Sequence, residues 1–245
     1  MANFKTRINK ISKTKGKIIL ANDYPHSERN LEAKTIKNIK TLHKFLCGIK
    51  INFHLLIPLG IKEISRINKI AHKYNLQCIA DIKLNDIGNT NEETLENLWK
   101  AGFDSVIVNP IMGKDALKKI VNSAHKKNKG IITLCHMSAP EARASYEMEI
   151  KNSKKKLYQL FLKLAILNKV DGIIVGATYP EIIKYCNQKS KGNLNIYSPG
   201  IGTQGGDILK VINAGSNFLI IGRTILKSKN PAKLAEEFQK LSILK

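Results

Sequence analysis

Short apolar runs alternate with longer amphipathic stretches from residue 17 onward. Eight runs have the length and β-branched content of buried strands, and each precedes a segment whose apolar residues recur at helical spacing. The predicted strands are Lys17–Asp23, Cys47–Asn52, Gln77–Lys83, Ser105–Asn109, Gly130–Met137, Gly172–Gly176, Asn195–Pro199 and Phe218–Gly222. The predicted helices are Leu31–Phe45, Ile61–Tyr74, Asn91–Ala101, Lys114–Lys126, Lys154–Asn168, Pro180–Gln188, Asp207–Asn213 and Pro231–Leu241. Eight strand–helix units in 245 residues favour a single-domain α/β fold, the TIM (β/α)8 barrel, over an open sheet, which shares the same local alternation.

Residues 1–16 form a basic lead-in to the first predicted strand. They could fold as a short helix that closes the barrel floor, or they could be a mobile arm. Residues 17–245 form the predicted barrel domain, because no linker-like stretch of Gly, Ser or Pro divides them. A dense charge run over Glu147–Lys156 is expected to be a solvated connection into the fifth helix.

The chain carries no signal for a membrane or for a metal. No apolar segment reaches the roughly 18 residues of a membrane span, and the first residues lack the apolar core of a signal peptide. Four widely spaced cysteines form no C-x-x-C pair, and the six histidines form no H-x-x-x-H pair. We therefore expect a cytoplasmic protein with reduced thiols and no bound metal.

The third predicted strand ends in charged residues, where burial is costly without compensation. A period of two places Asp81 and Lys83 on the same face of this strand, together with Ile79. An acid and a base therefore project together. We expect them to join a mutually compensating network that could include a further lysine.

Other polar residues follow the same rule of position. In a TIM barrel the functional groups lie at the carboxyl ends of the strands. Asp23 ends the first predicted strand, Lys50 lies in the second, Ser138 follows the fifth and Arg223 follows the eighth. Each has an ordinary structural explanation alone, but their joint placement predicts a functional site at this rim.

A glycine-rich segment, Ser198–Asp207, follows the seventh predicted strand. Its four glycines are expected to leave backbone N–H groups free to approach an anion and to let the loop move. The loops after strands seven and eight form the usual phosphate site of this barrel class, and an arginine such as Arg223 can bind phosphate oxygens with two hydrogen bonds. The sequence therefore predicts a phosphate site here.

The net charge of +22 would by itself suggest a polyanionic partner. The distribution of the charges argues against nucleic acid, because lysines are spread over every predicted helix and only 6% of the residues are aromatic. We expect most of these lysines to lie on solvated helix faces. Steering of an anionic small substrate is the remaining interpretation.

These motifs resemble one enzyme family. The pattern D-x-K-x-x-D-I-x-x-T begins at Asp81, S-P-G-I-G-x-Q-G-G-D begins at Ser198, and I-G-R ends at Arg223. Their order and positions closely resemble orotidine 5′-phosphate decarboxylases, and the resemblance extends from Leu20 to Ala232. It implies decarboxylation of orotidine 5′-phosphate to UMP, the last step of pyrimidine nucleotide synthesis, without a cofactor.

The resemblance also implies a role for each matching residue. Lys83 corresponds to the general acid that protonates the ring carbon, and Asp81 to the carboxylate beside the departing carboxylate. Asp86, Ile87 and Thr90 correspond to residues that reach the neighbouring subunit's site, which implies a homodimer. The implied catalytic residues are Lys50, Asp81, Lys83 and Asp86. The implied substrate-binding residues are Asp23, Lys50, Asp81, Ile87, Thr90, Ser138, Pro199, Gly200, Gly202, Gln204, Gly205, Gly222 and Arg223.

Two other interpretations remain open at this stage. One is a magnesium-dependent decarboxylase or aldolase of sugar phosphates, of the 3-keto-gulonate 6-phosphate type, on the same barrel. Such an enzyme needs an added metal carboxylate after the second strand, whereas Glu28 and Glu32 are the nearest early acids. The other is a nucleic-acid-binding protein on an inactive barrel, which only the net charge favours.

Overall fold

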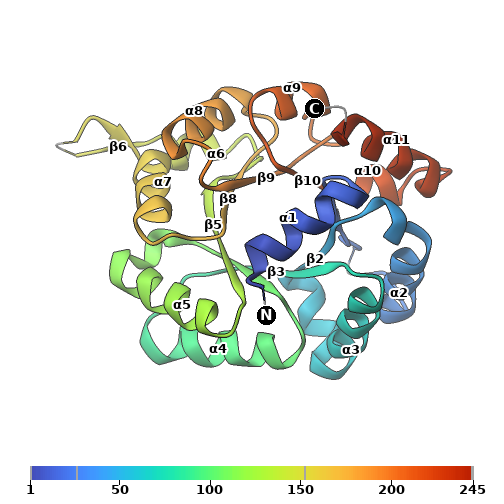
Figure 1. The fold of residues 1–245 in the computed structure, drawn as a ribbon. Helices are drawn as coiled ribbons and strands as arrows, with labels where there is room; N and C mark the ends of the chain where they lie inside the picture. The colour runs from blue at the N-terminus through green and yellow to red at the C-terminus, as the bar shows by residue number, and fades with distance from the viewer. Residues whose placement is uncertain (1, 26, 152, 244–245) are drawn as a thin grey trace.

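In the computed structural model, which describes residues 2–25, 27–151 and 153–243, eight parallel strands close into a barrel (Figure 1). Their order around the barrel is β1-β10-β9-β8-β5-β4-β3-β2. The strands are β1 Ile18–Ala21, β2 Gly48–Asn52, β3 Gln77–Leu84, β4 Ser105–Val108, β5 Gly130–His136, β8 Gly172–Val175, β9 Asn195–Pro199 and β10 Phe218–Ile221. Each overlaps one predicted strand, so the predicted barrel is confirmed.

Helices surround the barrel. They are α2 Leu31–Leu42, α3 Phe53–Lys73, α4 Gly88–Lys100, α5 Lys114–Lys126, α7 Leu157–Leu167, α8 Pro180–Ser190, α9 Ile208–Asn213, α10 Arg223–Leu226 and α11 Pro231–Ile243, with short 3-10 turns at His43–Phe45 and Pro110–Met112. The helix predicted between the second and third strands began at Ile61, but α3 begins at Phe53. Its first part precedes a kink at Gly60, whose φ is 64°. Pro58 lies in that first part, and a proline within a helix is unfavourable, so the sequence does not predict a helix there.

The charge run before α7 is more ordered than a plain connection. Helix α6 (Ala142–Tyr146) directly precedes it, and the run itself contains the two-stranded antiparallel sheet of β6 (Glu149–Ile150) and β7 (Lys155–Lys156). Lys156 donates to Glu147 over 2.7 Å, and its extended backbone delays the start of α7 to Leu157. The predicted helix start at Lys154 was therefore three residues early.

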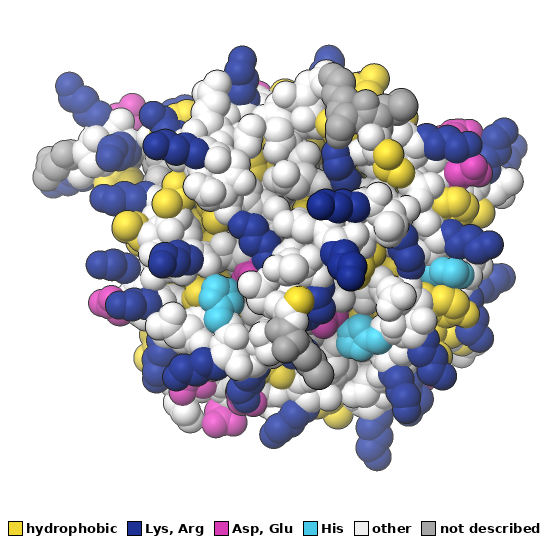
Figure 2. Space-filling model, viewed as in Figure 1, with side chains coloured by type: hydrophobic (Ala, Val, Ile, Leu, Met, Phe, Trp, Pro, Cys, Tyr) yellow, Lys and Arg dark blue, Asp and Glu magenta, His cyan; other side chains and the backbone are white. Residues whose placement is uncertain are grey.

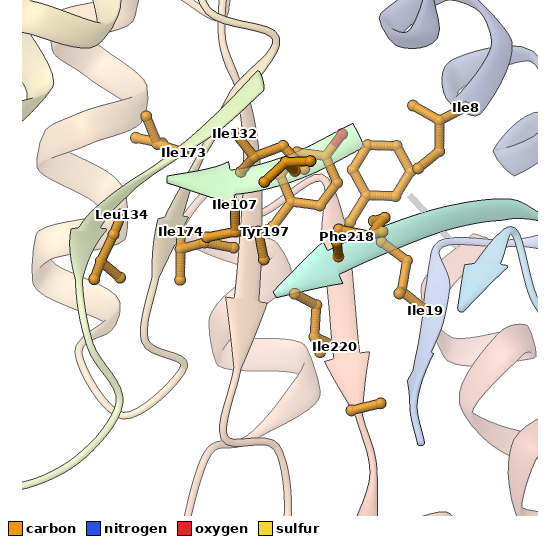
Figure 3. Close-up of a cluster of buried hydrophobic side chains, with 14 of the residues drawn as sticks. Ile8, Ile19, Ile107, Ile132, Leu134, Ile173, Ile174, Tyr197, Phe218 and Ile220 are labelled. Carbon is orange, nitrogen blue, oxygen red and sulfur yellow. The ribbon is translucent and has the colours of Figure 1, made fainter. Parts of the chain in front are cut away.

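The barrel interior is filled by large apolar side chains (Figure 3). The rings of Tyr197 and Phe218, from neighbouring strands, stack with centroids 4.7 Å apart. Gly172 on β8 makes room for them, because a Cβ there would lie 2.4 Å from the Tyr197 ring. The interior is a packed core, so ligands can enter only at the ends of the barrel.

The lead-in forms helix α1 (Phe4–Lys15), which crosses the floor of the barrel (Figure 1). Phe4 and Ile8 are fully buried, and Phe4 packs so closely on Gly130 that a Cβ there would lie 2.2 Å from its ring. Asn3 caps the helix by accepting from the Thr6 N–H. Helix α1 therefore covers the amino-terminal end of the barrel interior. Among the described residues, no helix is long and apolar enough to cross a membrane.

Candidate functional site

A cavity of about 310 Å³ opens at the carboxyl ends of the strands. Parallel strands end at the same rim, so side chains far apart in the sequence meet there. The lining includes these predicted site residues: Asp23, Lys50, Asp81, Lys83, Ser138, Pro199, Gly200, Gln204, Gly222 and Arg223. Below them, Ile107, Leu134, Ile174 and Ile220 form an apolar floor.

Three charged side chains form a continuous array in this cavity. Lys50 Nζ lies 2.9 Å from Asp81 Oδ2, and Lys83 Nζ lies 2.8 Å from Asp81 Oδ1. Asp81 therefore bridges two ammonium groups. The network predicted for the end of the third strand has this arrangement, and Lys50 is its further lysine.

The electrostatics of the array favour its charged form. Burial alone would raise the pKa of Asp81, but attraction to Lys50 and Lys83 and their hydrogen bonds lower it below the usual value for an aspartate. The carboxylate is therefore ionised at neutral pH. An ionised Asp81 in turn holds both ammonium groups in place.

Lys83 has an unusual backbone conformation, with φ at +47°. Residues other than glycine rarely occupy this region. The register between β3 and β4 shifts between Asp81 and Leu84, so Lys83 lies in an irregular part of the strand. In the single chain its side chain is 42% exposed, which leaves the ammonium accessible from the cavity.

Asp23 offers an unused acceptor to the cavity. Its Oδ1 is buried and accepts no hydrogen bond from the residues that the structure describes, and the Lys50 ammonium is 3.8 Å away. Gly222 faces it, and a Cβ there would lie 3.5 Å from Asp23 Oδ2 and 2.8 Å from the Ala21 carbonyl oxygen. A buried acceptor without a donor is costly, so this position is suited to a hydroxyl of a ligand.

The glycine-rich loop differs from its prediction in one respect. The N–H groups of Gly202, Gly205 and Gly206 were expected to be free, but they donate to carbonyl oxygens of the same loop over 2.7–3.0 Å. The reason is geometric, since positive φ at Gly202 and Gly205 folds the loop back on itself. These two glycines shape the turn and do not line the cavity, whereas the side chains of Gln204 and Arg223 do.

Three polar lining residues were not among the predicted site residues: Asn52, Thr203 and Thr224. Asn52 accepts a hydrogen bond from Lys50 Nζ. Strand alternation could have found it, because it lies two positions after Lys50 on β2. Thr224 Oγ1 donates to the Ile201 carbonyl oxygen over 2.9 Å and ties the start of α10 to the loop, a contact with no sequence signal.

Asp86 and Ile87 lie on the segment that joins β3 to α4, Thr90 lies in the first turn of α4, and none of the three lines the cavity. All three are exposed in the single chain. Asp86 Oδ1 accepts from the Ile87 N–H over 2.7 Å. Among the described residues, these three are therefore not part of the cavity that holds Lys50, Asp81 and Lys83.

Exposed apolar side chains gather on the segments that follow β2, β3 and β4, which are neighbours in the barrel. We call this set the apolar rim face, and each member is at least 50% exposed: Phe53, Ile57, Ile61, Ile87 and Ile111. Large exposed apolar groups of this kind are typical of a protein–protein contact.

Comparisons with known proteins agree with the geometry. A family model described as "Orotidine 5'-phosphate decarboxylase / HUMPS family" matches residues 16–238. The chain is 33% identical to the orotidine 5′-phosphate decarboxylase of Pyrococcus abyssi over 206 residues, which cover 84% of this chain and 91% of that protein. It is 32% identical to that of Methanosarcina mazei, over 91% of this chain and 94% of the relative.

Solved structures give the same result. The orotidine 5′-monophosphate decarboxylase of Methanocaldococcus jannaschii, complexed with the inhibitor BMP, has a TM-score of 0.78 and 28% identity, covering 92% of this chain and 98% of that one. The enzyme of Pyrococcus horikoshii has a TM-score of 0.75 and 30% identity, covering 91% and 98%. The similarity therefore extends over nearly the whole barrel.

Proposed function

Because the chain belongs to the orotidine 5′-phosphate decarboxylase / HUMPS family, its function is the decarboxylation of orotidine 5′-phosphate to UMP, and we propose that Lys83 is the proton donor. The observation that carries this assignment is the array of Lys50, Asp81 and Lys83 in the rim cavity. The enzyme is thus a carboxy-lyase.

The chemistry explains why such an array is needed. When the bond to the carboxylate breaks, its electron pair stays on the ring carbon, in the ring plane and without π delocalisation. Carbon dioxide leaves, and a proton must reach that carbon. The Lys83 ammonium supplies both the proton and a positive charge, and Asp81 holds it in position before the proton is transferred. No redox step or electron sink is required.

In this proposal the other lining residues bind different parts of the substrate. Asp23 Oδ1, the unused acceptor, and Lys50 bind the ribose hydroxyls. Ser138 meets the pyrimidine edge, while Gln204 and Arg223 bind the phosphate. Phosphate binding energy can then be used to hold the glycine-rich loop over the reacting ring and exclude water.

We propose that the protein is a homodimer whose apolar rim face is the contact surface. Asp86, Ile87 and Thr90 would then complete the neighbour's site, which explains why they are exposed here and do not line their own cavity. Burial of the five exposed apolar side chains would stabilise the contact.

The magnesium-dependent alternative is not favoured. Its candidate ligands are engaged elsewhere: Glu32 forms a bidentate ion pair with Arg66 at 2.6 and 2.8 Å, and Glu28 pairs with Lys34. Neither glutamate lines the cavity. We also propose a cytoplasmic location, since four buried thiols suit a reducing compartment.

The test follows the loss of orotidine 5′-phosphate absorbance in excess EDTA. Wild-type enzyme should turn over unchanged, and Lys83→Ala should lose at least about a thousandfold in kcat, because it lacks both the proton and the charge. Lys163→Ala, an exposed lysine on α7, is the matched control and should retain full activity. Wild-type turnover that requires a metal would contradict the proposal, and unchanged turnover of Lys83→Ala would contradict the role of Lys83.

A further inference from the structure

A second cavity, of about 790 Å³, lies at the opposite end of the barrel, between α1 and the amino-terminal ends of β3, β4 and β5. We call it the floor cavity. It is lined by Ala2, Arg7, Lys10, Ile11, Thr14, Lys15, His72, Asn75, Leu76, Gln77, Asp104, Lys127, Asn128 and Lys129. Its volume is in the range of small-molecule sites. The proposed decarboxylation uses none of these residues.

One wall of the floor cavity is a single face of α1. Five α1 residues line the cavity, and they recur at helical spacing along that face: Arg7, Lys10, Ile11, Thr14 and Lys15. A helix face turned toward a protein is usually apolar, but this one carries three cationic groups. The helix is fixed by the buried Phe4 and Ile8, and it lies outside the family match, which begins at residue 16.

The charge of the floor cavity is strongly unbalanced. Five of its lining side chains are lysine or arginine, and one, Asp104, is a carboxylate. Asp104 is already engaged, since Oδ1 accepts from Arg7 at 3.1 Å and Oδ2 accepts from His72 and from the Cys78 N–H, each at 2.8 Å. The same contacts occupy the oxygens that a metal ion at His72, Cys78 and Asp104 would need. Asp104 therefore holds α1 on the barrel, and its single charge offsets those of the five cations only in part, through Arg7 and Lys129.

The lysines of the floor cavity have few negative partners. Lys15 Nζ donates to the Tyr74 carbonyl oxygen, and Lys129 Nζ donates to that of Phe103 over 2.5 Å. Burial lowers the pKa of both lysines, which shows that water solvates their charges incompletely. Lys10 has no side-chain partner among the residues that the structure describes, and Lys127 alone pairs with a glutamate, Glu96. The face around α1 is rich in lysine and arginine as well (Figure 2).

We propose that the floor cavity binds a small oligophosphate, a chemistry shared by free inorganic oligophosphates and nucleoside di- and triphosphates. Cations stand on two walls, Lys10 and Lys15 on α1 and Lys127 and Lys129 at the turn before β5, so an anion with several phosphate groups can meet both. Lysine binds phosphate as a mobile point charge and needs no fixed fork geometry. The ligand supplies negative charge beyond that of the single carboxylate of Asp104.

The experiment is calorimetric titration of the full chain carrying Arg223→Ala, which weakens phosphate binding in the cavity at the other end of the barrel. The probes are inorganic tripolyphosphate and adenosine triphosphate, both without magnesium. Tripolyphosphate should bind, with an affinity that falls as salt rises. Lys10→Ala/Lys15→Ala should weaken it by about tenfold or more, because two charge-assisted contacts are lost. Tighter binding of the nucleotide would identify a nucleotide site, and equal or weaker binding a free oligophosphate site.

The control is Lys163→Ala/Lys184→Ala, which removes the same charge from exposed positions on α7 and α8 and should bind as the parent does. Lys10→Glu adds a second variant whose folding is safe, because Lys10 is exposed, and it should weaken binding further. The proposal is overturned if the parent shows no saturable binding, if both double variants lose affinity equally, or if an RNA oligonucleotide binds and tripolyphosphate does not. Decarboxylase activity does not enter this test, so its outcome is separate from that of the proposed function.

Discussion

At the scale of single residues, Lys83 combines a strained backbone with a central chemical position. A lysine at φ of +47° costs about 1–3 kcal/mol relative to a relaxed conformation. This backbone conformation directs the Lys83 side chain, and the ion pair with Asp81 fixes the position of its ammonium group. The strain is thus maintained by the same contact that prepares the proton donor. Asp81 consequently has two functions, since it compensates Lys50 and orients Lys83.

Asp23 allows a direct test of substrate contact. Asp23→Asn should lower kcat/KM by about 10–100-fold, mainly through KM, because a charged acceptor for a ribose hydroxyl is replaced by an amide. The melting temperature should stay the same or rise, since Oδ1 has no hydrogen bond to lose in the free protein. Steady-state kinetics and calorimetry measure the two effects. A fall in stability with unchanged KM would show that Asp23 has only a structural role.

The sequence predicted much of the site because parallel strands place distant residues at one rim. Asp23, Lys50, Asp81 and Arg223 could be assigned to this rim from strand ends alone. Asp86 and Thr90 could not, since nothing in their positions separates an exposed loop from a contact with a second chain. The closed hydrogen bonding of the glycine-rich loop was also missed, because a glycine pattern predicts backbone freedom and does not say which acceptors the N–H groups meet.

At the scale of elements, the close fit of α1 on β5 depends on Phe4 and Gly130 together. Gly130→Ala should destabilise the protein by about 1–3 kcal/mol, because the new Cβ would overlap the Phe4 ring. Phe4→Ala should cost about 3–5 kcal/mol. The double variant should be no less stable than Phe4→Ala alone, since the overlap disappears with the ring. Chemical denaturation measures this, and additive losses would contradict the assigned contact.

A histidine gives the outer helix α5 a pH-dependent attachment. His125 Nε2 lies 3.0 Å from Asp171 Oδ2, and this hydrogen bond raises the pKa of His125. A raised pKa in the folded state stabilises the protein below the unfolded value of about 6.5, and the contribution is lost as pH rises through the folded value. His125→Gln should therefore cost on the order of 0.5 kcal/mol more at pH 5.5 than at pH 9, a small value because the pair is partly exposed.

The comparison is made by urea unfolding at both pH values. Asp171→Asn should abolish the same pH dependence, since it removes the charge that raises the His125 pKa. An equal cost of His125→Gln at pH 5.5 and pH 9 would contradict the assignment.

Element prediction succeeded where length and periodicity were distinct. All eight strands of the barrel are short apolar runs, and none was missed. The first turns of α3 were missed because Pro58 and Gly60 oppose a helix locally while packing maintains one. The strands β6 and β7 were missed because each has two residues, mostly charged, and pairing in so short a sheet depends on contacts such as that of Lys156 with Glu147.

At the scale of the whole molecule, the proposed dimer makes a specific prediction about mixed subunits. Lys83→Ala and Asp86→Ala proteins should each be nearly inactive, but a mixture after subunit exchange should recover up to about one quarter of wild-type activity. In a mixed dimer one site carries both changes and the other carries neither. Exchange is verified by mass spectrometry or by energy transfer between labelled subunits. Complete exchange without recovery would contradict a shared site.

The closure of the barrel also fixes when the protein can complete its folding. β1 pairs with β10, beginning with Ile18 opposite Leu219 and continuing over the next two residue pairs. The first strand to be synthesised therefore pairs with the last. At ribosomal rates the nascent chain carries β1 with one edge unpaired for roughly 10–40 s. The last strand pair therefore forms at the very end of synthesis or after release. A chain truncated before Phe218 should consequently be a substrate for chaperones and proteases, because its exposed strand edges cannot find their native partner.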